Sequence, residues 1–281
     1  MRVLPLVAFA ITASGLAARA LRLSDERRAE VAWAHLAVQA SPSSDALTFT
    51  PEMVVGLPEP AQRYFHRVIA PGTRLRFASI IDMTGEIGLG TKAKPGYMPM
   101  HAREIIAPPH GFVWAPRIGS GLLQLSGADA FVAGHGWTRF WLGDLIPFAR
   151  SRHSADFDRS AAARSILEAL WAPASLLPVN GVAWEPIDQE RARAVFTVGG
   201  ESFPLELRVG GDGLPISVSM ARWTNANSER VFRWQPTGGF VEEIGTFAGY
   251  TIPLRMSAGN HFGTNDYFPF FRATVLHATF V

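Results

Sequence analysis

The order of apolar and polar residues changes character along the chain, and its first part is helical. An apolar run extends from Val3 to Ala18. Behind it, apolar residues at helical spacing predict a helix that begins at Ser24, a typical N-cap residue, and ends near Gln39. A second helix is predicted over 61–68, because the prolines just before it are tolerated in a first helical turn.

From Thr73 onward the period becomes two, which is typical of strands with one buried face. In the first strand, Leu75, Phe77 and Ile81 share the apolar face. Further strand-length runs are separated by glycine and proline, with one turn expected at 237–239. They cover 98–107, 112–118, 122–126, 128–133, 182–187, 191–198, 202–209, 214–222, 230–235, 240–247, 250–256 and 272–281.

One helix interrupts the strands. Apolar residues from Ala163 to Trp171 line one of its faces, Pro173 ends it, and Asp156 or Asp158 is expected to cap it. The pattern predicts an α+β protein that is mainly β. We expect a curved antiparallel sheet, a half-barrel meander, wrapped around a central helix at Ile166, because this arrangement buries the apolar faces of both.

The N-terminus has features of an export signal. The apolar run is shorter than the ~20 residues of a spanning helix and ends in Ala18-Arg19-Ala20, a pattern that signal peptidase cleaves. Arginines directly behind it favour retention as an anchor. We expect a signal peptide or N-terminal anchor over 1–20, a leading helix and link over 21–56, and one β-rich domain over 57–281. The expected location is periplasmic or extracellular, or at the inner membrane facing out.

Composition removes several classes of function. The 281 residues carry a formal net charge of only +2 without a basic cluster, which argues against a nucleic-acid partner. The chain has no cysteine, so thiol chemistry and metal–thiolate sites are excluded. Its eight histidines show no ligand-like spacing, and we interpret Asp156-x-Asp158 as a helix start, so no metal site and no cofactor are expected.

Sequence motifs of catalysis are missing. The chain contains no Gly-x-Ser-x-Gly elbow, no His-Glu-x-x-His, no phosphate-binding loop and no dinucleotide fingerprint. The sequence therefore favours a protein that is not an enzyme.

A set of motifs resembles a known family. They are Leu57-Pro58-Glu59-Pro60-Ala61-Gln62-Arg63-Tyr64-Phe65, Pro109–Trp114, Arg164–Pro173, Gly181–Trp184 and Gly249–Pro253. Together they resemble a bacterial family of uncharacterised proteins, a domain of unknown function with Leu-Pro-x-Pro-x-x-Arg-Tyr and Arg-x-x-Leu-Glu-x-x-Trp-x-Pro motifs. The resemblance runs from about Leu57 to the C-terminus and implies no activity. The meander is also similar to the half-barrel of LolA-like bacterial lipoprotein carriers, a likeness of fold alone.

Arg164 and Glu168 are the first candidate ligand-binding residues. They lie four positions apart, on one face of the predicted helix. A buried pair could present the guanidinium to a carboxylate or phosphate head group while the glutamate fixes its orientation. The alternative is a structural bridge between helix and sheet.

Aromatic residues supply the other candidates. Trp114, Trp171 and Trp184 could line one concavity for an apolar ligand, or could fill the core. Arg63 and Tyr64 in the Leu-Pro-x-Pro helix could contact a ligand, or could brace the helix against the sheet.

These observations favour a non-enzymatic binder or carrier of a lipid or other apolar ligand, with membrane association through the N-terminus. Two alternatives stay open. One is an enzyme with a dispersed acid/base site that starts from Glu168 and Arg164. The other is an envelope interaction module, which would show a flat exposed apolar patch and no deep pocket.

Overall fold

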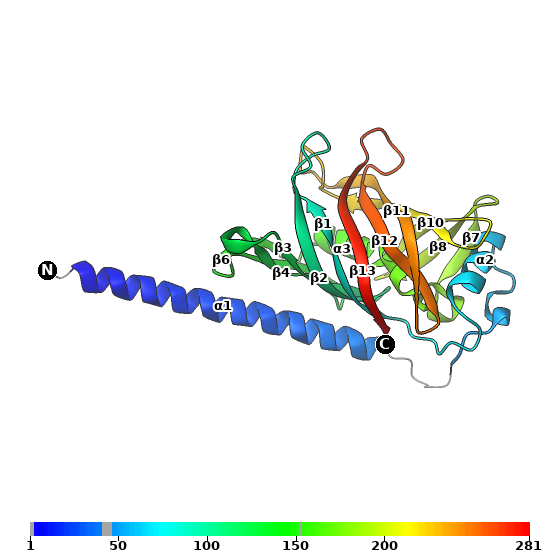
Figure 1. Ribbon diagram of the computed structural model, residues 1–281, viewed down its shortest axis with the longest axis horizontal. Coiled ribbons are helices and arrows are strands. Elements are labelled where there is room, and N and C mark those ends of the chain that lie inside the picture. The colour runs from blue at the N-terminus through cyan, green and yellow to red at the C-terminus, as the bar shows by residue number, and fades with distance from the viewer. Residues whose placement is uncertain (1–2, 41–46, 152) are drawn as a thin grey trace.

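The computed structural model describes residues 3–40, 47–151 and 153–281, and for residues 3–14 the backbone alone. In this part of the chain, thirteen strands form one antiparallel sheet in the order β6-β5-β4-β3-β2-β1-β13-β12-β11-β10-β9-β8-β7 (Figure 1). The strands are β1 (Ser79–Gly88), β2 (Tyr97–Ala107), β3 (Gly111–Ile118), β4 (Leu125–Val132), β5 (His135–Leu142), β6 (Ile146–Ser151), β7 (Ala183–Pro186), β8 (Arg191–Val198), β9 (Glu201–Val209), β10 (Pro215–Thr224), β11 (Arg233–Phe247), β12 (Tyr250–Asn260) and β13 (Phe268–Phe280).

Two meanders make up this sheet, one on each side of a central pair. Strands β1 to β6 pair in chain order, and so do β7 to β13. The first and the last strand join the two meanders, with Ser79 opposite Phe280. Strands β6 and β7 are the two edges, so the sheet does not close into a barrel.

Helix α3 (Ala155–Leu167) lies inside the curve of the sheet. It contacts β3, β4 and β5 in one meander and β9 and β10 in the other. Because these strands are far apart in the strand order, one helix can touch both sets only if the sheet curves around it (Figure 1). The expected half-barrel around a central helix is confirmed. Short 3-10 helices follow α3, namely η3 (Ala169–Trp171), η4 (Pro173–Leu176) and η5 (Pro178–Asn180).

The start of α3 differs from the expectation. Ser154 has the extended backbone of an N-cap, and its hydroxyl accepts a hydrogen bond from the Phe157 N–H at 3.2 Å. Neither Asp156 nor Asp158 caps the helix, because both lie inside its first turns. Asp158 instead accepts a hydrogen bond from the backbone N–H of Gly136 in β5 at 2.7 Å.

Helix α2 (Glu59–Val68) ends where the sequence predicts but starts two residues earlier than expected, with Pro60 in its first turn. Its buried side chains include Tyr64 and Phe65. The preceding residues contain the 3-10 helix η1 (Pro51–Val54), and both Phe49 and Val54 are fully buried in the main core. The segment expected to be a link therefore contributes to the core.

Helix α1 (Val3–Gln39) runs without a break through Ser24, so the expected helix start there is wrong, while the expected end near Gln39 is confirmed. No boundary at residue 20 interrupts it. Its C-terminal half packs on the outer face of β2, β3 and β4, where Leu36 is fully buried, and its N-terminal end extends beyond the sheet (Figure 1). No helix among the described residues has the length and apolarity needed to span a membrane.

Two pairs of expected strands are single strands. The run 128–133 and the end of the run 122–126 merge into β4, while Leu122 and Leu123 form part of a 3-10 helix; 230–235 and 240–247 merge into β11 from Arg233 onward. The turn expected at 237–239 is absent because the glycines there serve close packing. A Cβ on Gly238 would lie 2.4 Å from the Val218 carbonyl oxygen, and one on Gly239 would lie 2.5 Å from that of Ser257. Strands β5 and β6 were not expected from the sequence.

A candidate ligand-binding cavity

A cavity of about 300 Å³ lies on the concave side of the sheet, beside α3 and η3. Side chains or backbone from β1, β3, β4 and β10 to β13 form the rest of its wall. The closely packed glycines of β11 belong to this wall, so the cavity reaches down to the strand backbone. Its apolar lining consists of Ile87, Leu167, Trp171, Val218, Met256, Ala258, Phe270 and Phe271.

Arg164 forms the centre of a charged network at one side of the cavity. Its Nε donates to Glu168 Oε1 at 2.8 Å, Nη1 donates to Asp129 Oδ2 at 2.5 Å, and Nη2 donates to Glu104 Oε1 at 3.2 Å. The three carboxyls come from the end of α3, from β4 and from β2. Every nitrogen of this guanidinium is thus engaged by a carboxyl, and the network ties the helix to two strands.

The protonation of this network follows from its burial. Burial alone would lower the pKa of Arg164, but Glu168, Asp129 and Glu104 outweigh burial and raise that pKa above its usual value. Burial raises the pKa of Glu104 well above its usual range, and the charge of Glu168 raises it further. Glu104 therefore favours its neutral form and shares a hydrogen bond with Glu168.

Two aromatic rings cover the Arg164 guanidinium. Its central carbon lies 4.2 Å from the centre of the Phe112 ring and 5.1 Å from that of Trp114. These distances are typical of cation–π contacts. The arginine is therefore closed in by apolar as well as by charged partners.

A second arginine, Arg222 of β10, lies on the cavity wall. Its Nε donates to the carbonyl oxygen of Ser160 in α3 at 3.1 Å, and its two terminal nitrogens have no hydrogen bond to any described residue. Burial, and after it the positive charge of Arg164, lower the pKa of Arg222 to about 10, while Asp129 and Glu168 oppose the shift. Arg222 thus stays charged at neutral pH and keeps donors unused.

Two other lining residues have buried polar atoms without a partner among the described residues. They are the indole nitrogen of Trp114 and the hydroxyl of Thr237. Buried polar groups are normally hydrogen-bonded. These atoms give the cavity donors and an acceptor beside its apolar wall.

The other expected tryptophans lie in different places. Trp171 lines the cavity, and its indole N–H donates to the carbonyl oxygen of Pro253 at 3.0 Å. Trp184 is not part of the cavity wall. Its N–H donates to the Leu176 carbonyl oxygen at 2.9 Å, and its ring meets Phe65 edge-on at 5.6 Å.

Arg63 and Tyr64 are also outside the cavity. Arg63 donates to the carbonyl oxygens of Gly210 and Gln189 at 3.3 and 3.0 Å and pairs with Glu59. Tyr64 is buried in the main core. Of the expected residues, the structure therefore brings together Arg164, Glu168, Trp171 and Trp114, and places the other three at helix α2.

A family model matches residues 47–273, which is more than three quarters of the chain. The chain belongs to DUF6544, a family of unknown function. The family expected from the sequence motifs is thereby confirmed. A search of curated proteins finds no match to this DUF6544 chain.

Solved structures similar to this DUF6544 chain are distant. A LolA superfamily protein from Nitrosomonas europaea has 10% identity and a TM-score of 0.37, with 78% of this chain and 90% of that chain covered. A putative outer membrane lipoprotein-sorting protein domain from Vibrio parahaemolyticus has 9% identity, a TM-score of 0.34 and coverage of 72% and 85%. A DUF1329 family protein from Desulfovibrio piger has 10% identity, a TM-score of 0.34 and coverage of 73% and 84%.

Sequence reasoning missed Glu104, Asp129 and Arg222, although a signal for them exists. Each is a charged residue two positions away from at least one apolar core residue on the same face of its strand, namely Ile106 for Glu104, Phe131 for Asp129 and Met220 for Arg222. Arg222 follows Val218 and Met220 on the buried face of β10. A charge at such a position of an alternating strand is costly unless it is paired, and it therefore marks a site.

Proposed function

We propose that this protein binds and carries a lipid or another apolar ligand, and that the preferred ligand is an amphiphile with an anionic head group. The observation that carries the proposal is the combination of a largely apolar cavity with one wall cation, Arg222, whose terminal nitrogens are unused. Ligand pockets are commonly apolar with a few polar groups that fix orientation.

Arg222 suits the head group better than Arg164. All three nitrogens of Arg164 already bind carboxyls, so a ligand anion would have to displace one of them. A carboxylate or phosphate beside Arg222 would instead accept two hydrogen bonds from free donors. In this proposal Arg164 and Glu168 hold the wall in place, while Trp171 and Phe271 contact the apolar tail.

The direct test is native mass spectrometry of the full chain purified without detergent. We expect a population with a bound small molecule, and a rise in melting temperature when fatty acids are added to delipidated protein. A mass that matches the bare chain, together with an unchanged melting temperature, would count against the carrier.

A second experiment isolates the head group. A fatty acid should bind wild type more tightly than its methyl ester, and in Arg222→Met this preference should fall roughly tenfold or more, since hydrogen bonds to charged groups contribute about 1.5–3 kcal/mol. Arg208→Met removes an arginine from an exposed ion pair on a neighbouring strand and serves as the control. If the preference for the acid over its methyl ester is equal in wild type and Arg222→Met, Arg222 is excluded as the head-group site.

A third experiment fills the cavity. Ala258→Phe places a ring into the cavity wall and should abolish binding of both the acid and the ester. Ala221→Phe places the same ring at an exposed position next to Arg222 in the sequence and should leave binding unchanged. Binding that survives Ala258→Phe would locate the ligand elsewhere.

One observation favours an enzyme as the second candidate. Glu104, with its raised pKa, and the carboxylate Glu168 form a pair of the kind that general acid–base catalysis uses. Glu104 is fully buried and does not line the cavity, which argues for a structural role. An added lipid ester that is hydrolysed by wild type but not by Glu168→Gln would favour the enzyme, whereas intact recovered ester favours the carrier.

We further propose that the protein contacts a membrane at the end where α1 extends beyond the sheet. The helix η2 (Gly121–Leu123) and the β5–β6 turn meet there, because a Cβ on Gly143 would lie 2.8 Å from the Leu122 carbonyl oxygen. Leu145 of this turn lines a groove together with α1 residues from Gly15 to Glu26. The exposed apolar residues of this patch are Leu122, Leu123, Leu145, Ile146 and Phe148.

Vesicle flotation tests the patch. The full chain should float with vesicles of phosphatidylethanolamine and phosphatidylglycerol, and the triple variant Leu122→Asp, Leu145→Asp, Phe148→Asp should float less. The double variant Val179→Asp, Val231→Asp changes exposed valines elsewhere and is the control. Equal flotation of both variants and wild type would mean that the patch does not touch the membrane.

Envelope localisation is part of the same proposal, and cell fractionation is its test.

A further inference from the structure

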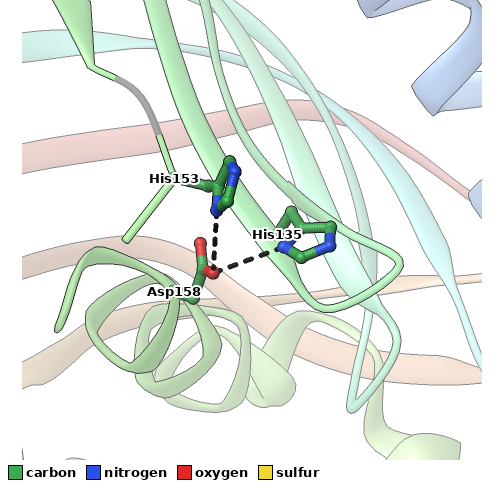
Figure 2. Close-up of side chains that lie close together, drawn as sticks. All are labelled: His135, His153 and Asp158. Atoms are coloured by element: carbon green, nitrogen blue, oxygen red, sulfur yellow. Dashed lines mark hydrogen bonds and ion pairs between the residues drawn. The ribbon is translucent and has the colours of Figure 1, made fainter. Parts of the chain in front are cut away.

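Two histidines and an aspartate meet at the N-terminal end of α3, away from the cavity. His135 begins β5, His153 follows β6, and Asp158 lies in α3 (Figure 2). The His135 Nδ1 atom lies 3.3 Å from Asp158 Oδ2, and His153 Nδ1 lies 3.9 Å from the same oxygen. One potential ligand atom from each residue falls within 4.8 Å of the other two.

The position of Asp158 is fixed by the fold. Its Oδ1 accepts the hydrogen bond from the Gly136 N–H, which leaves Oδ2 directed at the two imidazoles (Figure 2). Gly136 also permits the close approach of α3 to β5, because a Cβ there would lie 2.9 Å from both Phe157 and Ala161. The carboxylate is therefore preorganised, while the two imidazoles are exposed and free to adjust.

These donors are those of a transition-metal site, and one of their distances already fits it. Tetrahedral Zn²⁺ binds histidine nitrogen and carboxylate oxygen at about 2.0–2.2 Å, which separates neighbouring ligand atoms by about 3.3–3.5 Å. The contact between His135 and Asp158 already has this length. The His153–Asp158 contact has to shorten by about half an ångström, and the two imidazoles, whose ligand atoms lie within 4.8 Å of each other, have to close by up to about 1.5 Å. Two imidazoles with one carboxylate suit Zn²⁺ and not the oxygen-seeking Ca²⁺ or Mg²⁺.

We propose that His135, His153 and Asp158 bind one divalent transition-metal ion, with Zn²⁺ as the best match. The three residues come from the β5–β6 edge of the sheet and from the central helix, so the ion would clamp that edge to α3. With three protein ligands, a fourth position stays open for water. The site is independent of the proposed lipid cavity, since none of its residues lines that cavity.

Calorimetric titration of the untagged, chelator-treated full chain with Zn²⁺ alone tests the site. We expect one equivalent to bind and the melting temperature to rise with it. His135→Ala and His153→Ala should each weaken Zn²⁺ binding by at least about tenfold, since even loss of a residue that merely supports a metal ligand costs 10–100-fold. Asp158→Asn, which retains an acceptor for the Gly136 N–H, should weaken it as well.

The control is the double variant His66→Ala, His101→Ala, which removes two exposed histidines from α2 and β2. It should bind Zn²⁺ like wild type. Co²⁺ provides a second readout, because a tetrahedral site gives an intense visible absorption that His135→Ala should abolish. No heat of binding in wild type, or equal Zn²⁺ affinity in wild type and His135→Ala, would overturn the proposal and leave a hydrogen-bonded His135–Asp158 contact with His153 beside it.

Discussion

Two helices pack on opposite faces of the same sheet, and an arginine–carboxylate contact joins each of them to it. On the concave face, α3 contributes the arginine, Arg164, and the sheet contributes two of the three carboxyls. On the outer face the roles are reversed: α1 contributes Asp25, which accepts hydrogen bonds from Arg150 of β6 at 2.5 and 2.9 Å. The Trp141 indole of β5 donates to the same carboxylate at 3.1 Å.

The two contacts differ in their access to water. Among the carboxyls, the Glu104 side chain is 1% exposed and that of Asp25 is 10% exposed; among the arginines, Arg164 is 18% exposed and Arg150 is 30% exposed. Glu104 left without Arg164 would stay in the protein interior, whereas Arg150 left without Asp25 could turn to solvent. Helix α3 is therefore part of the folded core. Helix α1 packs on the outside of the sheet, where water could solvate some of the groups that it contacts.

Arg164→Met should produce the largest effect, because it removes the guanidinium to which Glu168, Asp129 and Glu104 are all hydrogen-bonded. Removing one partner of a buried ion pair costs about 3–5 kcal/mol of the free energy of unfolding, and we expect a loss in this range. Urea denaturation at pH 7.5 measures it.

Arg159→Met is the matched control on the same helix. Its partner Glu201 is about half exposed, so this variant should unfold close to wild type. A similar loss of stability in both variants would contradict the view that the buried network, and not the arginine side chain as such, holds α3 in place.

The architecture was largely accessible from the sequence, since alternation and glycine-rich turns mark most strands of both meanders. The predictions of local structure that were wrong share one cause. The glycines at 238 and 239 resemble a turn, but they serve close strand packing, a demand of neighbouring strands that no local pattern reveals. In the same way Ser24 resembles a helix start, yet α1 continues through it.

The candidate site was accessible only in part. Arg164 and Glu168 share a helix face and were found together, as local spacing allows. Glu104 and Asp129, the partners that complete the network, come from strands 60 and 35 positions away in the chain. The same limit hid His135, His153 and Asp158, because only the fold brings the β5–β6 hairpin to the start of α3.

Leu36→Ala should have the next largest effect, on the outer helix alone. Leu36 is fully buried between α1 and the sheet. Buried Leu→Ala substitutions cost about 2–5 kcal/mol, and we expect about 2–3 kcal/mol because a helix on the surface can shift to close the gap. Hydrogen exchange should accelerate in α1 and stay unchanged in α3.

Val38→Ala is the control, since Val38 lies on the same helix with 76% of its surface exposed. It should leave the exchange of α1 unchanged. If Leu36→Ala accelerates exchange in α3 and α1 equally, the two helices form one cooperative unit and the contrast drawn between them is wrong.

Glu104→Gln should have the smallest effect on stability at neutral pH. The direction in which this effect changes with pH distinguishes the buried network from an exposed ion pair. Burial, reinforced by Glu168, raises the pKa of Glu104 in the folded protein well above 4.5. The folded state then holds the Glu104 proton over a range in which the unfolded state has lost it. The contribution of Glu104 to stability is therefore complete below about pH 4.5 and is lost as the pH rises through its folded pKa.

Glutamine cannot lose a proton, and its amide can still donate to Glu168 and accept from Arg164. The difference in free energy of unfolding between Glu104→Gln and wild type should therefore shift in favour of the variant as the pH rises from 4.5. Glu201→Gln is the opposite case, because the hydrogen bond from Arg159 lowers the Glu201 pKa, so its contribution is lost as the pH falls. Urea titrations from pH 4 to 9 measure both. If the free energies of unfolding of Glu104→Gln and wild type change in parallel across this range, Glu104 is not the protonated member of the network. The buried and the exposed pairs would then differ in packing alone and not in protonation.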